Sequence, residues 1–341
     1  MIFGRRGRER FLEAVTGLEA AVRERDGKAA QHAIQQMYGG FDEAADHELL
    51  AAGPRLAALL PEMPDGPRAM TAVAVGACVE RGADATQCAG YVFDGLAGAL
   101  GAAGEFCERW EATGGGDLPD HDSGDPEPEV LERVGQAATA GWWLLPRWEM
   151  ATVAMLNRPE VRTGLGSGLR TRLLEALRAV QELSGHDFKC LHYALLVLDD
   201  EPLVALHRPT GTGYALRMTG IGDNFQLHTL LADALVGGGH VPGHAPSAQE
   251  TAVCRDAPGQ VPTTGSFNLV TPDGDWVWNE GTPSDIPVVD GVRLLVLDPP
   301  PYQRGWPAGR FFPGMTGALV LERVLDQNET RGWLERCAPA K

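Results

Sequence analysis

The periodicity of the apolar residues changes once along the 341-residue chain, close to Gly185. Before that point, apolar side chains recur with the 3.6-residue period of helices. Phe11, Val15, Leu18 and Val22, for example, follow an i, i+4, i+7, i+11 spacing that puts them on one stripe of a helix. After that point, the pattern moves towards the two-residue period of strands. The sequence therefore predicts an α+β protein in which a helical region precedes a domain that contains a sheet.

Four segments are expected from this change and from one acidic interruption. Residues 1–112 and 129–185 read as helical, forming a bundle or an irregular helical array in which the second segment continues the first. Residues 113–128 hold three consecutive glycines, three prolines and four aspartates, which is typical of a solvated loop or linker. Residues 186–341 are expected to form an α+β domain, with a mainly antiparallel sheet and two or more helices.

The first two strands of this domain are expected to form a hairpin. The apolar runs 191–198 and 202–207 flank the acidic dipeptide Asp199-Asp200, which would be its two-residue turn. Further strands are expected at 213–219, 266–270, 275–280, 292–297 and 317–324, and helices at 224–236 and 327–336.

The charge of the chain argues against two classes of partner. The formal net charge is −17 and the pI is about 4.9. Coulomb repulsion from phosphate groups therefore disfavours binding to nucleic acid or to an anionic membrane surface. The six cysteines show no C-x-x-C pair, and no secretory signal or spanning segment is evident, so a cytoplasmic protein is expected. Lysine is rare beside arginine, alanine and glycine, which indicates a bacterial-type, high-GC coding composition.

Several common catalytic motifs are missing from the sequence. There is no G-x-x-x-x-G-K, no complete dinucleotide fingerprint, no H-E-x-x-H and no G-x-S-x-G. No nucleotide cofactor is therefore expected, and any cofactor would have to be recognised from other residues.

Two histidines suggest a metal site with an incomplete set of ligands. If the hairpin turns at Asp199-Asp200, His192 faces His207 across the ladder, at a Cβ separation of about 4.5–5.5 Å. Two imidazoles at that distance could share a transition metal ion or a proton. The alternative, which we favour, is that each histidine bonds a backbone carbonyl at a strand end.

Polar side chains are concentrated between Arg208 and His228, where a glycine-rich loop leads into a predicted helix. Asp223 is the expected N-cap, with Gln226 three residues later. The first N–H groups of such a helix can bind a carboxylate or phosphate, to which Arg208 and Asn224 would add contacts. On a helical wheel Gln226 falls on the wet face and His228 at the boundary, where half-burial tunes a pKa for proton transfer. The alternative is an ordinary capped helix.

An aromatic stripe and a proline-rich loop complete the candidates. Strict alternation puts Trp276, Trp278 and Glu280 on one face of the expected strand, where they could wall a pocket for a flat or cationic ligand. The alternative is packing against helices. The segment Asp298–Tyr302, followed by Arg304, reads as a rigid surface loop that could recognise anions.

These patterns lead to two hypotheses about function. The first is an enzyme or a small-molecule-binding protein, acting on an anionic or polar substrate by acid–base or metal-assisted chemistry. Its catalytic residues would be His207, Asp223, His228 and Glu280, and its ligand-binding residues Arg208, Asn224, Gln226, Trp276 and Trp278. The second is a non-catalytic helical scaffold that docks a partner protein through its tryptophans. In the first hypothesis the ligand is a small molecule or a peptide.

Overall fold

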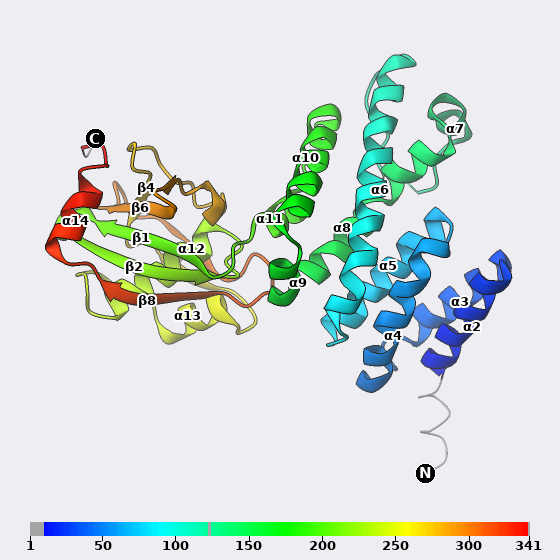
Figure 1. Ribbon diagram of the computed structural model, residues 1–341, viewed down its shortest axis with the longest axis horizontal. Coiled ribbons are helices and arrows are strands. Elements are labelled where there is room, and N and C mark those ends of the chain that lie inside the picture. The colour runs from blue at the N-terminus through cyan, green and yellow to red at the C-terminus, as the bar shows by residue number, and fades with distance from the viewer. Residues whose placement is uncertain (1–9, 122–123, 340–341) are drawn as a thin grey trace, which may run out of the picture. The chain divides into compact units, whose positions relative to one another are not determined.

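The computed structural model describes residues 10–121 and 124–339 (Figure 1). The chain divides into two compact units, Met1–Leu195 and Leu196–Lys341. The first is helical and the second combines a mixed sheet with helices, so the predicted α+β class is confirmed. The division falls at Leu195, not at the predicted residue 185.

The helices of the first unit follow one another through short turns, except for the longer loop between α6 and α7. They are α2 (Arg10–Glu24), α3 (Gly27–Gly40), α4 (Asp46–Leu59), η1 (Leu60–Glu62), α5 (Asp65–Glu80), α6 (Ala85–Ala112), α7 (Pro128–Val134), α8 (Gln136–Leu156), α9 (Pro159–Gly164), α10 (Ser167–Ser184) and α11 (Lys189–Leu196). Of the stripe predicted for the first of them, Phe11, Val15 and Leu18 are buried and Val22 is partly buried. Within the described residues, no helix is long and apolar enough to span a membrane.

Two glycines explain how closely α6 and α8 pack. A Cβ atom at Gly95 of α6 would overlap the ring of Trp148, and one at Gly141 of α8 would overlap Ala102. Glycine lowers helix stability by about 1 kcal/mol relative to alanine, and here it allows the two longest helices to pack backbone against side chain.

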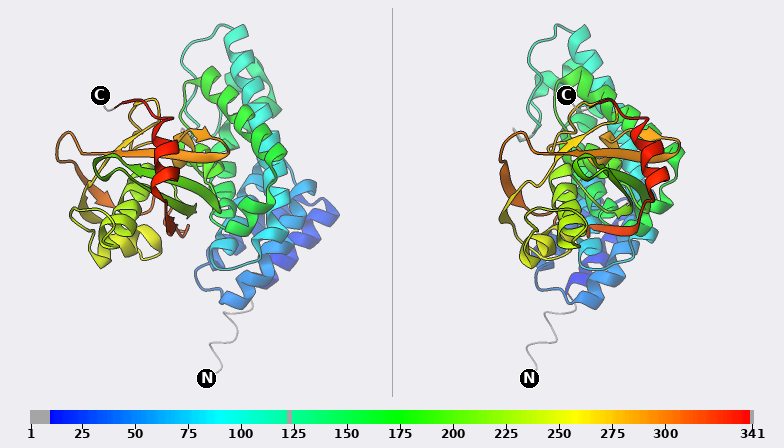
Figure 2. Two further views of the ribbon diagram at one scale, coloured as in Figure 1. Left: turned by 60° about the vertical axis from the view of Figure 1, so that its left-hand side comes forward. Right: turned by 90° about the vertical axis from the view of Figure 1, so that its left-hand side faces the viewer.

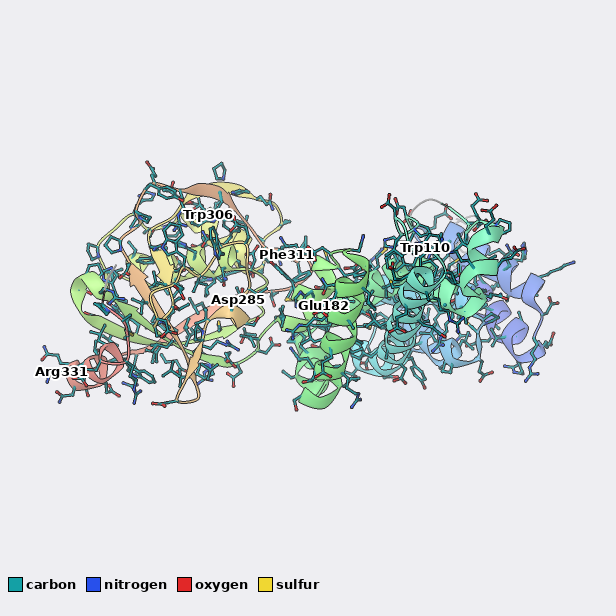
Figure 3. The ribbon with its side chains drawn as sticks, turned by 90° about the horizontal axis from the view of Figure 1, so that it is seen from above. Trp110, Glu182, Asp285, Trp306, Phe311 and Arg331 are labelled. Carbon is teal, nitrogen blue, oxygen red and sulfur yellow. The ribbon has the colours of Figure 1, made fainter. Side chains whose placement is uncertain are left out.

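The acidic segment 113–128 is a loop within the helical unit and does not link two domains. Three indole N–H groups hold it: Trp110 donates to the carbonyl of Gly116 at 3.2 Å, Trp142 to that of Pro119 at 2.9 Å and Trp143 to that of Gly124 at 2.9 Å. Trp110 is labelled in Figure 3. These tryptophans therefore satisfy carbonyls of a segment that has little apolar content of its own.

The second unit is built on one mixed sheet. Its strands are β1 (Glu201–His207), β2 (Thr212–Thr219), β4 (Asn268–Val270), β5 (Val288–Val289), β6 (Val292–Asp298) and β8 (Ala318–Val324), in the order β4-β6-β1-β2-β8 with β5 paired to β6. Strands β3 (Val261–Thr264) and β7 (Gly305–Ala308) form a separate two-stranded sheet. Among the strands in the described part of the chain, only β1 and β6 pair in parallel, so the sheet is mainly antiparallel, as predicted.

Helices cover both faces of the main sheet. Helices α12 (Asn224–Ala232) and α13 (Ala248–Arg255) pack on one face, in a core with Leu203, Ala205 and Leu295. Helix α14 (Gln327–Leu334) packs on the other face, near Val204 and Leu206. Figure 2 shows α14, in red, against the sheet. The π-helical turn η3 (Asp233–Gly237) extends α12.

The predicted hairpin of 191–198 with 202–207 is wrong. Residues 189–196 form α11, in which Leu191, Ala194 and Leu195 are buried at the i, i+3, i+4 spacing of a helix face. Strand β1 instead pairs with β2, across the short turn η2 (Arg208–Thr210), and with β6. The strand predicted at 275–280 is reduced to one isolated bridge, between Val270 and Trp276.

Candidate functional site

The polar residues at the start of α12 connect buried backbone segments. Asp223 caps the helix as predicted, its Oδ1 accepting from the N–H of Gln226 at 2.8 Å. Asn224 is fully buried and donates from Nδ2 to the carbonyls of Trp278 at 2.9 Å and Thr282 at 3.1 Å. These bonds tie the helix N-terminus to the 278–282 segment.

Gln226 is buried, so its predicted place on a wet face is wrong. Its Oε1 accepts from the N–H of Gly222 at 2.9 Å and its Nε2 donates to the carbonyl of Cys254 at 2.7 Å. The amide thus joins the loop before α12 to the end of α13, and both of its polar atoms are engaged in that role.

His228 is also buried, 1 % exposed, and does not lie at a wet boundary as predicted. Its Nε2 accepts from the backbone N–H groups of Ser266 and Phe267, both at 3.1 Å, so the neutral ring carries its proton on Nδ1. The pKa of His228 is lowered to about 4, mainly by burial and then by the charge of Arg304, while a hydrogen bond to Asn279 acts in the opposite direction. The ring of Trp306 (Figure 3) lies 4.9 Å from that of His228, centroid to centroid. Protonating Nε2 would break both backbone bonds.

The two histidines of the predicted metal pair do not face each other on a hairpin. His192 lies on α11 of the helical unit, while His207 ends β1 opposite Thr212 of β2. The Nδ1 of His207 is 2.8 Å from Oγ1 of Thr210, and burial lowers its pKa while the charge of Asp298 raises it. In the described part of the chain, no three His, Cys, Asp or Glu side chains gather as metal ligands would.

A groove lies where the two parallel strands end. Arg208 directly follows β1 and Asp298 is the last residue of β6, and because these strands run in parallel their carboxyl ends meet. Arg208 Nε donates to Oδ1 of Asp298 at 2.7 Å, and Arg208 Nη1 donates to the carbonyl of Ala338 at 2.9 Å. The groove has a volume of about 670 Å³. We call it the Arg208–Asp298 groove. It is lined by Arg208, Pro209, Asn268, Val270, Gly274, Trp276, Asp298, Pro299, Pro301 and Pro339.

Strand alternation separates this groove from the histidines. Val204 and Leu206 point to the face that α14 covers, and Arg208 bonds to the segment that follows α14. His207 points to the opposite face, where its ring lies 6.0 Å from that of Phe267 in the core beneath α12. Arg208 and His207 are therefore sequence neighbours on different sides of the sheet.

Aromatic and proline rings form the apolar wall of the groove. Trp276 is 40 % exposed, and four prolines join it. The Arg304 guanidinium lies 5.7 Å from the Trp276 ring centroid, and its Nη2 donates to Oδ1 of Asn268 at 3.2 Å. Trp278 is 66 % exposed, and its ring lies 6.0 Å from that of Trp276, but it is not part of the lining.

Two of the predicted ligand-binding residues, Arg208 and Trp276, come together in this groove. Among the described residues that line it, the other predicted candidates are missing, namely His192, His207, Asp223, Asn224, Gln226, His228, Trp278 and Glu280. Glu280 is exposed. It directly precedes Gly281, whose carbonyl accepts a hydrogen bond from the N–H of Asn224 at the start of α12. Sequence reasoning did not find Asn268, which is placed opposite Asp298 only by the pairing of β4 with β6.

Comparisons of the chain with protein-family models, with curated proteins and with solved structures find no match.

Proposed function

We propose that the second unit binds a small organic ligand with a flat ring, and that the Arg208–Asp298 groove is its site. The observation that carries the proposal is that one concavity combines an exposed indole with a charged pair. Its volume of about 670 Å³ falls within the range of about 300–1,000 Å³ typical of ligand pockets.

The walls of the groove suit a ring. The Trp276 indole offers a flat apolar face, and the pyrrolidine rings of the four prolines are rigid, so they lose little conformational entropy when a ligand is bound. The polar end, at Arg208 and Asp298, would fix the orientation of the ligand, as a few polar groups do in most small-molecule sites.

Binding is favoured over catalysis by the disposition of the ionisable groups. Among the described lining residues, Arg208 and Asp298 carry the charges, and they bond to each other. The histidines considered as acid–base groups, His207 and His228, pack with Phe267 on the face of the sheet beneath α12. Proton transfer to a ligand in the groove would thus need a group from elsewhere.

The test compares two tryptophans that lie two positions apart. Ring-containing fragments are screened by ligand-observed NMR against the full chain and against Trp276→Ala and Trp278→Ala. Both side chains are exposed, so both variants should keep their thermal stability within about 1 kcal/mol. We expect fragments whose signals are lost with Trp276→Ala and retained with Trp278→Ala. A screen in which no binder depends on Trp276 would refute the proposal.

A further inference from the structure

The charges of the Arg208–Asp298 groove come as a close pair of opposite sign. The two side chains, 20 % and 17 % exposed, are joined by the 2.7 Å bond from Arg208 Nε to Asp298 Oδ1. Arg208 Nη1 is also held, by the carbonyl of Ala338 at 2.9 Å. Arg208 is therefore held by two partners, and the pair is mostly screened from water by the groove walls.

Further charges of both signs flank this pair. Arg304 bonds Asn268 of the groove lining, and Asp273 adjoins Gly274 in the turn that borders it. Burial raises the pKa of the Cys337 thiol, the charge of Arg208 lowers it, and the charges of Asp273 and Asp298 raise it, so all three charged groups act on the same thiol. The groove is accordingly not a surface of a single sign.

A ligand with one net charge fits such a pair poorly. An anion that approaches Arg208 is repelled by the carboxylate of Asp298, and a cation that approaches Asp298 is repelled by the guanidinium. Either ligand also competes with a bond already formed inside the groove, and a displaced partner would be left desolvated and unpaired. A ligand that presents an acceptor next to a donor meets both members of the pair without separating them.

We infer that the ligand is dipolar: a flat ring that carries either a zwitterionic head group or a carboxamide. This inference rests on the proposed function and narrows its ligands from flat-ring compounds in general to those whose head group carries adjacent donor and acceptor atoms. The carboxylate or carbonyl oxygen would face Arg208, the ammonium or amide N–H would face Asp298, and the ring would lie against Trp276 and the prolines.

Four probes with the same phenyl ring and different head groups test the inference. L-phenylalanine is zwitterionic, phenylacetamide is a neutral dipole, phenylacetate is an anion and phenethylamine is a cation. Their dissociation constants are measured with the full chain by NMR titration, with Trp276→Ala as the control for the site. At least one dipolar probe should bind about tenfold more tightly than both singly charged probes. If only phenylalanine binds more tightly, the head group of the ligand is zwitterionic. If only phenylacetamide does, the head group is a carboxamide.

Substitutions of the pair should change this preference in opposite directions. Asp298→Asn removes the repulsion of anions and should improve phenylacetate relative to phenethylamine, whereas Arg208→Gln should do the reverse. Thermal unfolding of each variant shows whether it is folded. The comparison of the four probes on the wild-type chain tests the inference even if a variant does not fold.

Two results would overturn the account at different levels. If phenylacetate or phenethylamine binds the wild-type chain in a Trp276-dependent manner and at least as tightly as both dipolar probes, the dipolar inference fails and the groove remains a site. If none of the four probes binds, both the inference and the proposed function fail for single-ring ligands.

Discussion

Arg208 donates a 2.7 Å hydrogen bond from Nε to Oδ1 of Asp298, a residue 90 positions further along the chain. The contact exists because β1 and β6 pair in parallel, with His207 opposite Leu297, so that the residues after these positions leave the sheet side by side. The same pairing creates the concavity, because the chain turns away from the sheet at η2 after β1 and at Pro299 after β6. The pair is thus a consequence of the sheet topology.

Coupling within the pair gives the first prediction. Arg208→Ala and Asp298→Ala should each lower the free energy of unfolding by about 1–3 kcal/mol, because each leaves a mostly buried charged partner without its bond. Arg208→Ala should cost more, since it also removes the bond to Ala338. In urea unfolding the double variant should lose less than the two single losses combined. Additivity within about 0.5 kcal/mol would show that the two side chains do not interact.

Acid should destabilise the second unit through His228. The pKa of His228 is lowered to about 4 in the folded chain, from the value of 6.5 that is usual for an exposed histidine. The unfolded chain therefore binds more protons between these values, and stability falls as the pH drops from about 6.5 to about 4. The difference corresponds to at most about 3 kcal/mol.

Unfolding by urea at several pH values measures this loss, with His228→Gln as the comparison. The glutamine Oε1 can accept from the N–H groups of Ser266 and Phe267 but does not titrate. Its stability should change less over this pH range than that of the wild type. Equal pH dependence in the two proteins would mean that His228 is not the responsible group.

A buried amide should matter more than an exposed one. Gln226→Leu leaves the N–H of Gly222 and the carbonyl of Cys254 without their partner, and should cost about 2–4 kcal/mol. Gln327→Leu, at an exposed position on α14, should stay within about 0.5 kcal/mol. Similar losses for both variants, measured by urea unfolding, would be inconsistent with the cross-linking role of Gln226.

Asp223 should act as a helix cap, and serine should replace it. Asp223→Ala removes the bond to the N–H of Gln226 and should lower stability by about 1 kcal/mol, whereas Asp223→Ser should restore most of it. Calorimetric unfolding of the two variants distinguishes a cap from a residue whose carboxylate is specifically needed. A serine variant as unstable as the alanine variant would argue against the capping role.

The sequence predicted what depends on local order. The stripe through Phe11, Val15 and Leu18 and the cap at Asp223 are set by residues within one or two helical turns, and the structure contains both. The strand predicted at 191–198 is wrong because a short apolar run fits a buried strand as well as a helix face. The predicted pairing of His192 with His207 required 191–198 to be a strand beside β1. Because this segment is helical, the two histidines do not pair.

The candidate site depended on contacts that local patterns do not encode. Gln226 looked exposed on a helical wheel because a wheel contains only its own helix, whereas α13 covers that face through Cys254. Arg208 and Trp276 were each recognisable as binding residues, but their meeting requires the parallel pairing of β1 with β6 and the bridge from Val270 to Trp276. Long-range strand pairing of this kind has no signature in the segments concerned.

The central claim, that the Arg208–Asp298 groove holds a ring compound against Trp276, is tested most directly by isothermal titration calorimetry. The dipolar probe that binds most tightly is titrated into the wild-type chain, Trp276→Ala and Trp278→Ala under one set of conditions. The account predicts an affinity at least about tenfold weaker for Trp276→Ala and unchanged for Trp278→Ala. Equal affinities for all three proteins would contradict it.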